Sequence, residues 1–255
     1  MSDPDLETLA LACRILAMEG HDDVSLGHLS LRDPEGRGFW MKRFFLGLDE
    51  IMGPEDFLLL DFEGKILAGA GQRHSEWPIH SEILLARDDV NVVGHSHPFY
   101  ACLFAATHET LAPIGQEGIH FAGNTPHYRD TSDLIDSKPL GQDLAAALRN
   151  AKVVFMKNHG ITFCGPTIAN ATITGIYIEK ACQAQLVLNG SGLAWGVPEK
   201  AETDGKADNL GAMGLWDNFF AYYGRKLLRH EGAGDQAERL RAETMGWQRG
   251  SRKVP

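Results

Sequence analysis

Two short apolar segments of this 255-residue chain end in histidine, and no other feature of the sequence constrains the fold more. Residues 90–93 run into the motif Gly94-His95-Ser96-His97-Pro98, and residues 153–156 run into Asn158-His159-Gly160. Apolar runs of this length are typical of buried β-strands. Alternate side chains of a strand point to one face, so His95 and His97 can hold one ligand together. The pattern predicts a divalent-metal site made of imidazoles at the edge of a sheet.

The His-x-His pair alone does not establish such a site. The chain contains 11 histidines, so a single pair with this spacing can also arise by chance. The abrupt change from apolar to polar residues at the end of the strand favours the metal site, because ligands bind at strand ends in α/β folds.

The bulk properties of the chain argue against several classes of function. Its formal net charge of -10 is unfavourable for binding to nucleic-acid phosphates. The sequence contains no apolar run near the roughly 20 residues of a membrane span, and its acidic start does not resemble a secretion signal. The four cysteines are widely spaced, which is typical of free thiols in a reducing compartment. We therefore expect a cytoplasmic protein that binds neither nucleic acid nor membrane.

Local patterns predict helices and strands in mixed order along the chain. Helices are predicted over residues 6–18, 75–87, 101–106, 140–150, 167–188 and 210–229. Further strands are predicted over residues 24–32, 39–45, 57–62 and 66–68. Residues 110–139 are predicted to form short strands and loops, and residues 190–205 a turn-rich connector. We expect one mixed α/β domain over residues 1–255, with helices on both faces of the sheet and a C-terminal helical extension from about residue 207.

Glu76 is the natural fourth group of the metal site. It stands at the start of the helix that leads into the His95 strand, where Ser75 is predicted as the N-cap and Pro78 lies in the first turn. Three histidines and one carboxylate suit Zn, Mn, Fe(II) or Co. A first-turn carboxylate is also favoured by the helix dipole alone, so the position of Glu76 by itself leaves both interpretations open.

The segments 75–80, 87–98 and 158–160, in this order and spacing, resemble the class II aldolase/adducin family over about residues 6–188. The resemblance implies a three-layer α/β/α domain around a largely antiparallel sheet. It also implies one divalent metal per subunit, with Mn²⁺ or Zn²⁺ expected ahead of Fe²⁺ or Co²⁺. The metal would be held by His95, His97 and His159, with Glu76 as a ligand or acid/base group. Members of the family are commonly homotetramers with active sites at subunit interfaces, and the same is expected here.

The chain departs from the pattern of the family's sugar-phosphate aldolases. Those enzymes usually carry Gly-Asn in the early strand, a Thr-Gly loop next, and Ser-Ser before the metal-site Glu. This chain has Gly27-His28, then Lys42-Arg43-Phe44-Phe45-Leu46-Gly47, then His74-Ser75. Bulkier cationic and imidazole groups thus replace small donors suited to a phosphate. The altered pattern is more similar to the decarboxylase branch of the family, whose substrates are flat hydroxylated rings that lose a carboxylate.

Several residues are predicted to contact such a substrate. Lys42 or Arg43 would bind a second carboxylate of the ring, although charged residues at a strand edge are usually only solvated. Ser75 is retained from the family pattern and is expected at the substrate. Glu76, His74 and His28, in that order, are the candidate proton donors, and the two histidines can instead orient the substrate or a loop. His80, one helical turn after Glu76, is expected to support the site from outside the ligand set.

The leading hypothesis is a metal-dependent decarboxylase of an ortho-hydroxy aromatic or heteroaromatic acid, with such an acid as its small-molecule partner. The first alternative is an aldolase that cleaves a hydroxy-ketone or a sugar phosphate. A non-catalytic, adducin-like interaction domain and an Fe(II) oxygenase remain open. The metal histidines argue against the interaction domain, because adducin heads are expected to lack them.

Overall fold

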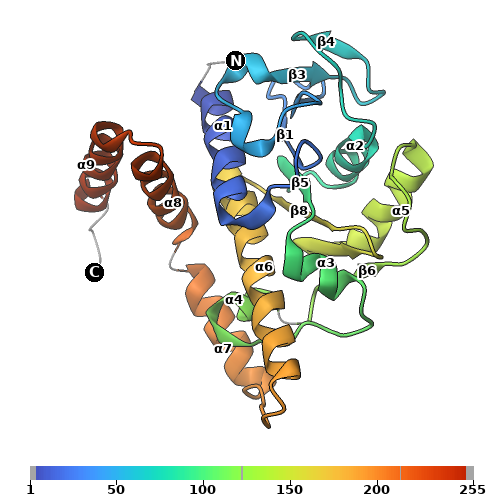
Figure 1. Cartoon of the computed structure of the whole chain (residues 1–255), viewed down its shortest axis with the longest axis vertical. Coiled ribbons are helices and arrows are strands. Elements are labelled where there is room, and N and C mark those ends of the chain that lie inside the picture. The colour runs from blue at the N-terminus through green and yellow to red at the C-terminus, as the bar shows by residue number, and fades with distance from the viewer. Residues whose placement is uncertain (1–3, 122, 213, 251–255) are drawn as a thin grey trace.

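The structure, a computed structural model, describes residues 4–121, 123–212 and 214–250 (Figure 1). An eight-stranded sheet with the order β4-β3-β2-β1-β5-β8-β7-β6 forms its middle layer. The strands are β1 (His28–Arg32), β2 (Phe39–Lys42), β3 (Phe57–Leu60), β4 (Ile66–Ala68), β5 (Val92–Ser96), β6 (His127–Tyr128), β7 (Val153–Met156) and β8 (Ile161–Gly165). Among the described residues, all neighbouring strands are antiparallel except β6 and β7.

Helices cover both faces of the sheet. The helices are α1 (Pro4–Leu16), α2 (Trp77–Ala86), α3 (Phe99–Ala105), α4 (Gly115–Ile119), α5 (Lys138–Leu148), α6 (Ile168–Gly190), α7 (Lys200–Ala212), α8 (Trp216–His230) and α9 (Gly234–Gly250). A π-helical turn, η1 (Ala17–His21), continues α1, and two short 3₁₀ turns, η2 (Leu48–Glu50) and η3 (Pro54–Asp56), precede β3. Helices α1, α3 and α6 pack on one face, while α2 and α5 pack together on the other.

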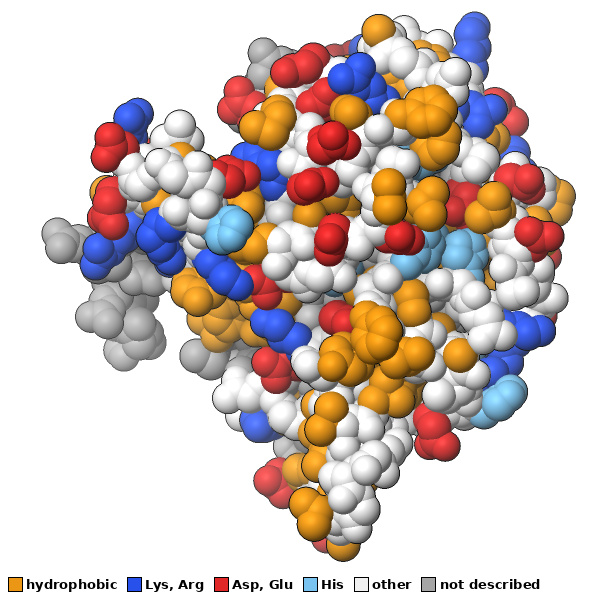
Figure 2. All heavy atoms as spheres, viewed as in Figure 1, with side chains coloured by type: hydrophobic (Ala, Val, Ile, Leu, Met, Phe, Trp, Pro, Cys, Tyr) orange, Lys and Arg blue, Asp and Glu red, His pale blue; other side chains and the backbone are white. Residues whose placement is uncertain are grey.

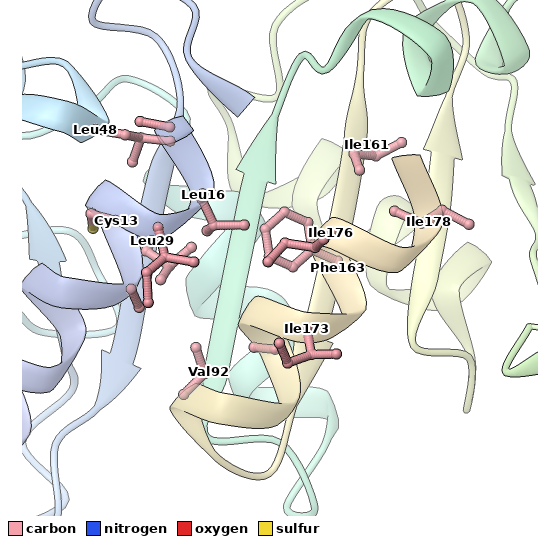
Figure 3. Close-up of a cluster of buried hydrophobic side chains, with 14 of the residues drawn as sticks. Cys13, Leu16, Leu29, Leu48, Val92, Ile161, Phe163, Ile173, Ile176 and Ile178 are labelled. Carbon is pink, nitrogen blue, oxygen red and sulfur yellow. The ribbon is translucent and has the colours of Figure 1, made fainter. Parts of the chain in front are cut away.

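The strand residues alternate between two hydrophobic cores, as a sheet buried on both faces requires. Figure 3 shows the larger core, where Phe163 of β8 lies beside Leu16 of α1 and Ile176 of α6, and Val92 of β5 lies near Ile173 of α6. The next residue of β5, Val93, belongs to the second core, beneath α2 and α5. The prediction of a three-layer α/β/α fold with a mostly antiparallel sheet is confirmed.

Some predicted elements were wrong. Residues 161–165 form β8, which the sequence analysis did not assign, because Thr, Cys and Gly interrupt its apolar pattern. Helix α7 begins at Lys200, inside the segment predicted to be a turn-rich connector, since helix-forming residues follow Pro198. Within the described ranges, none of the helices combines the length and hydropathy that crossing a bilayer requires.

The C-terminal helices α7, α8 and α9 follow the sheet domain (Figure 1). Helix α8 packs on α1 and α6, and α9 packs on α8. The single domain over residues 1–255 and its extension from about residue 207 stay predictions.

Candidate metal centre

Strand register brings two histidines from distant parts of the chain together. His28 opens β1 and lies directly opposite His95 in the antiparallel β1–β5 pair. Directly opposite residues of paired strands share a face, here the face that α2 covers. The two imidazole rings lie 5.0 Å apart, and both side chains are buried.

The three histidines of the sequence motifs converge at the end of β5. His97 follows β5, and its Nε2 lies 3.0 Å from Nε2 of His95. His159 sits in the turn that joins β7 to β8, and its ring stacks on that of His97 at 5.2 Å. The ligand atoms of all three histidines lie within 4.8 Å of one another. This proximity is what the spacing of the motifs predicts.

Glu76 faces the same point from the start of α2. Its Oε2 lies 3.6 Å from Nε2 of His95 and 3.9 Å from Nε2 of His28, and its Oε1 lies 3.8 Å from Nε2 of His159. The backbone N–H of Ile135 donates to Oε1 at 2.9 Å. Glu76 itself occupies the N-cap position and makes no capping hydrogen bond, so the predicted Ser75 cap was wrong. The carboxylate turns into the site instead of capping the helix.

Burial controls the charge of these groups. It lowers the pKa of His95 well below its ordinary value and, with help from His97, lowers the pKa of His159 to about 4. Burial raises the pKa of Glu76 to about 7, against an opposing effect of the Ile135 N–H. The imidazoles are therefore neutral near pH 7, which is the form that binds a metal.

Hydrogen bonds fix which ring nitrogens carry protons. Nδ1 of His95 lies 3.0 Å from the carbonyl oxygen of Ile161, and Nδ1 of His97 lies 2.9 Å from Oδ2 of Asp23. Both partners are acceptors, so each Nδ1 donates and each Nε2 carries a lone pair. Two lone pairs facing each other at 3.0 Å repel unless a cation lies beside them. Ligands about 2.1 Å from a metal and at right angles to each other stand about 3.0 Å apart, so these residues fit a divalent cation.

Two other predicted site residues, His74 and Lys42, lie near His28. His74 lies beside His28, with ring centroids 4.5 Å apart, and Nζ of Lys42 donates to Nε2 of His74 at 3.1 Å. The buried Lys42 also donates to the carbonyls of Ser25 and Leu46, and burial lowers its pKa to about 8. These contacts link Lys42 and His74 to the centre through His28.

Arg43 and Ser75 stand apart from this cluster. Arg43 pairs with Asp56 at 2.9 Å, and the side chain of Ser75 is exposed. The predicted substrate contacts of Lys42, Arg43 and Ser75 stay predictions, as do the catalytic roles of Glu76, His74 and His28.

A hollow of about 350 Å³ opens onto the centre. It is lined by Asp23, Leu26, Glu76, His97, Ser132, Asp133, Leu134, Asn158 and His159. Figure 2 shows histidine side chains reaching the surface of this face, bordered by acidic and hydrophobic side chains. These lining residues include three carboxylates and two leucines, and none of them is Lys or Arg.

Three groups that support the histidines and Glu76 were not predicted from the sequence. Asp23 and the N–H of Ile135 come from loops, and no motif marks them. Ser30 was detectable, because it lies two residues after His28 on the same face of β1. His80, expected to support the site from outside the ligand set, hydrogen-bonds to His28 and Ser30.

Comparisons with known proteins show which proteins this chain resembles. A 3,4-dihydroxyphthalate decarboxylase of Arthrobacter keyseri is 28% identical over 207 residues, which cover 73% of this chain and 79% of that protein. A 4-hydroxy-3-prenylphenylpyruvate oxygenase/4-hydroxy-3-prenylbenzoate synthase of Streptomyces roseochromogenus subsp. oscitans is 28% identical over 240 residues, 92% of this chain and 86% of that one. The solved structure of L-fuculose 1-phosphate aldolase from Glaciozyma antarctica PI12 superposes with a TM-score of 0.78, at 29% identity and 90% coverage of both chains. The family model for the class II aldolase and adducin N-terminal domain matches residues 7–186, and the chain therefore belongs to the class II aldolase/adducin family.

Proposed function

We propose that this protein is a divalent-metal-dependent carboxy-lyase that removes CO₂ from an ortho-hydroxy aromatic or heteroaromatic acid. The composition of the hollow carries the proposal. Glu76, His97 and His159 line it together with Leu26 and Leu134, and Lys and Arg are missing from its described lining. A flat ring fits against leucine side chains, and the metal would bind its carboxylate and hydroxyl oxygens.

Charge argues against a sugar phosphate in this hollow. A phosphate monoester brings close to two negative charges and is usually bound by Arg, Lys or a helix N-terminus. The carboxylates of Asp23, Glu76 and Asp133 line the hollow instead. Of the two cations predicted to contact substrate, Arg43 pairs with Asp56, and the N–H groups of Lys42 have acceptors. The name of the Arthrobacter relative, a decarboxylase of a dihydroxylated aromatic acid, also supports this substrate class.

Each residue of the candidate metal centre would have its own role in the reaction. His95, His97 and His159 would hold the cation, and Glu76 completes the donor set before substrate binds. A bound divalent cation would act as a Lewis acid that lowers the pKa of a coordinated hydroxyl and withdraws electrons from the bond to the departing carboxylate. The Ile135 N–H donates a hydrogen bond to Oε1 of Glu76. The proton of this carboxyl is therefore on Oε2, the oxygen that faces His28 and His95.

In the proposed reaction, Oε2 of Glu76 gives this proton to the ring carbon that carries the carboxylate. A carbon–hydrogen bond forms, the carbon–carbon bond breaks, and its electrons restore the aromatic ring as CO₂ leaves. In the metal-free protein, burial raises the pKa of Glu76 to about 7, within the range of groups that exchange a proton near neutral pH. Glu76 then regains a proton from water through the hollow.

A second candidate function is aldol cleavage of a hydroxy-ketone. The match to the Glaciozyma aldolase over 90% of both chains favours it. Both reactions break a carbon–carbon bond near an oxygen substituent of the substrate, and His95, His97, His159 and Glu76 would hold the cation for either one.

The experiment starts from protein stripped of metal by a chelator. It is reloaded with Mn²⁺, Zn²⁺, Fe²⁺ or Co²⁺ and incubated without oxygen with 2,3-dihydroxybenzoate, hydroxypyridine carboxylates, hydroxy-ketones and sugar phosphates. We expect metal-dependent CO₂ release from the hydroxy acids. His95→Ala should abolish it, and replacement of the exposed His108 by Ala should not. Cleavage of hydroxy-ketones or sugar phosphates alone, or turnover that requires oxygen, would refute the proposal.

We also propose that the protein forms a homotetramer with its sites at subunit interfaces. Large apolar side chains near the hollow are exposed, among them Val24 at 87%, Phe99 at 65% and Leu134 at 49%. Such side chains are typical of a surface that a second subunit covers. Sedimentation equilibrium should give a mass near four times 28.0 kDa, and a monomer would contradict this proposal.

A further inference from the structure

A buried chain of hydrogen bonds leads from the middle of the sheet to the candidate metal centre. Nδ1 of His80, on α2, lies 2.6 Å from Oγ of Ser30, on β1. Nε2 of His80 lies 2.7 Å from Nδ1 of His28, two residues before Ser30 on the same face of the strand. The side chains of all three residues are at most 1% exposed, so water does not compete for these bonds.

The direction of each hydrogen bond follows from the carbonyl oxygen of Val93, at the end of the hydrogen-bond chain away from the candidate metal centre. The hydroxyl of Ser30 donates to the carbonyl oxygen of Val93 at 3.4 Å, and a carbonyl can only accept. The lone pairs of Ser30 Oγ are then free to accept from Nδ1–H of His80. Burial lowers the pKa of His80 to about 3, so its ring is neutral and carries one proton only. Its Nε2 must therefore accept, and Nδ1 of His28 must donate to it.

At the candidate metal centre, this chain of hydrogen bonds ends at Nε2 of His28. This atom lies 3.9 Å from Oε2 of Glu76, and the ligand atoms of His28, Glu76 and His95 lie within 4.8 Å of one another. Since Nδ1 of His28 holds the proton of the neutral ring, Nε2 presents a lone pair to the centre. With the opposite tautomer, Nε2–H would be a donor there and could not accept a hydrogen bond from a bound molecule.

We infer that Ser30 and His80 are positioning residues that hold His28 as the Nδ1–H tautomer, so that its Nε2 accepts the hydroxyl hydrogen of the bound acid. The inference rests on the proposed function for the identity of that acid. It deepens the proposal by naming the feature of the substrate that the site recognises, a free hydroxyl group next to the carboxylate. An ether at the same position has no hydrogen to donate.

The tautomer is tested first, on the full-length, metal-free protein labelled with ¹⁵N-histidine. We expect the nitrogen chemical shifts of His28 to show a protonated Nδ1 and an unprotonated Nε2. Ser30→Ala should convert His28 to a tautomer mixture, and Ser30→Thr, which keeps the hydroxyl, should restore the wild-type spectrum. A protonated Nε2 in the wild type, or no change in Ser30→Ala, would overturn the inference. His80→Gln provides a second test of the chain if Ser30→Ala fails to fold.

The recognition is tested by calorimetry on Zn²⁺-loaded protein with 2-hydroxybenzoate and 2-methoxybenzoate. We expect Ser30→Ala to weaken 2-hydroxybenzoate binding about tenfold and to leave 2-methoxybenzoate and Zn²⁺ binding within about twofold. Equal losses for both acids would mean that the chain only supports the fold and would overturn the inference. Neither measurement depends on turnover, so failure of decarboxylation with the tautomer established would count against the proposed function alone.

Discussion

Gly160 allows His97 to reach the candidate metal centre, and a single added methyl group should displace it. A Cβ atom built at Gly160 would lie 2.5 Å from Cδ2 of His97 and 2.6 Å from the carbonyl oxygen of Ser96. Carbon atoms in contact normally stand about 3.5–4.0 Å apart, so Gly160→Ala creates an overlap of about 1 Å. The backbone at Gly160 does not lie in the left-handed region, so the effect comes from this overlap and not from backbone strain.

The size of the expected loss follows from the tolerance of metal coordination. Metal–ligand distances vary by about 0.2 Å, and moving the His97 ring by about 1 Å therefore removes it from the donor set. Changes that only disturb the groups supporting a metal ligand already cost about 10- to 100-fold in affinity. We expect Gly160→Ala to lower Zn²⁺ affinity by at least this factor, or about 1.4–2.8 kcal/mol. Overpacking should also lower the unfolding free energy of the metal-free protein by about 1–3 kcal/mol.

The assay is a competition titration of metal-free protein with Zn²⁺ and a chromophoric chelator, together with urea unfolding. Gly190→Ala is the matched control, because a Cβ at Gly190, the last residue of α6, would meet nothing within 4 Å. It should bind Zn²⁺ as the wild type does. Wild-type affinity in Gly160→Ala would refute the role given to His97, and an equal loss in the control would show that the assay reports the fold.

Three further predictions concern the groups around the imidazoles. Asp23→Ala removes the acceptor of His97 Nδ1–H, so Zn²⁺ affinity should fall about 10- to 100-fold in the same titration, and unchanged affinity would count against the tautomer assigned to His97. The pKa of Glu76 is raised to about 7, so its contribution to stability is complete below pH 4.5 and is lost as the pH rises through 7. Metal-free Glu76→Gln should accordingly be more stable than the wild type by up to about 3 kcal/mol at pH 8 in urea unfolding, and equal stability would contradict the burial of a charge there. Burial lowers the pKa of His21 to about 4. The contribution of the neutral His21 to the free energy of unfolding is therefore present above pH 6.5 and is lost as the pH falls through 4. His21→Gln should flatten this fall in the free energy of unfolding.

The convergence of His95, His97 and His159 could be predicted from the sequence because each one lies in a motif at the end of a strand. His95 and His97 follow the apolar run of β5, and His159 follows that of β7, so strand periodicity was enough to expect a shared site. Glu76 could be placed only as the residue that begins the helix before β5. Its orientation toward His95 depends on the N-cap geometry of α2, which sequence patterns do not encode.

The supporting groups depend on packing between distant segments. His28 reaches the centre because β1 pairs with β5 in a register that places it opposite His95. Asp23 precedes Val24, a residue with a φ of 48° that β-branched side chains rarely adopt. A propensity argument would not place a bend there, so the hydrogen bond from His97 could not be foreseen. His80 could be expected to support the site, but its partners, His28 and Ser30, depend on the packing of α2 against β1.

The charges at the hollow imply an order of binding. The carboxylates of Asp23 and Asp133 line it, while the imidazoles beside them are neutral. The N–H groups of the nearest buried cation, Lys42, are directed to backbone carbonyls and to His74. A negatively charged acid therefore meets net repulsion in the metal-free protein, and a divalent cation reverses it. The proposed reaction thus requires the metal to bind before the acid, and calorimetry should detect no 2-hydroxybenzoate binding after chelation. Binding of equal strength without metal would place the acid elsewhere and would remove the basis for assigning it to this centre.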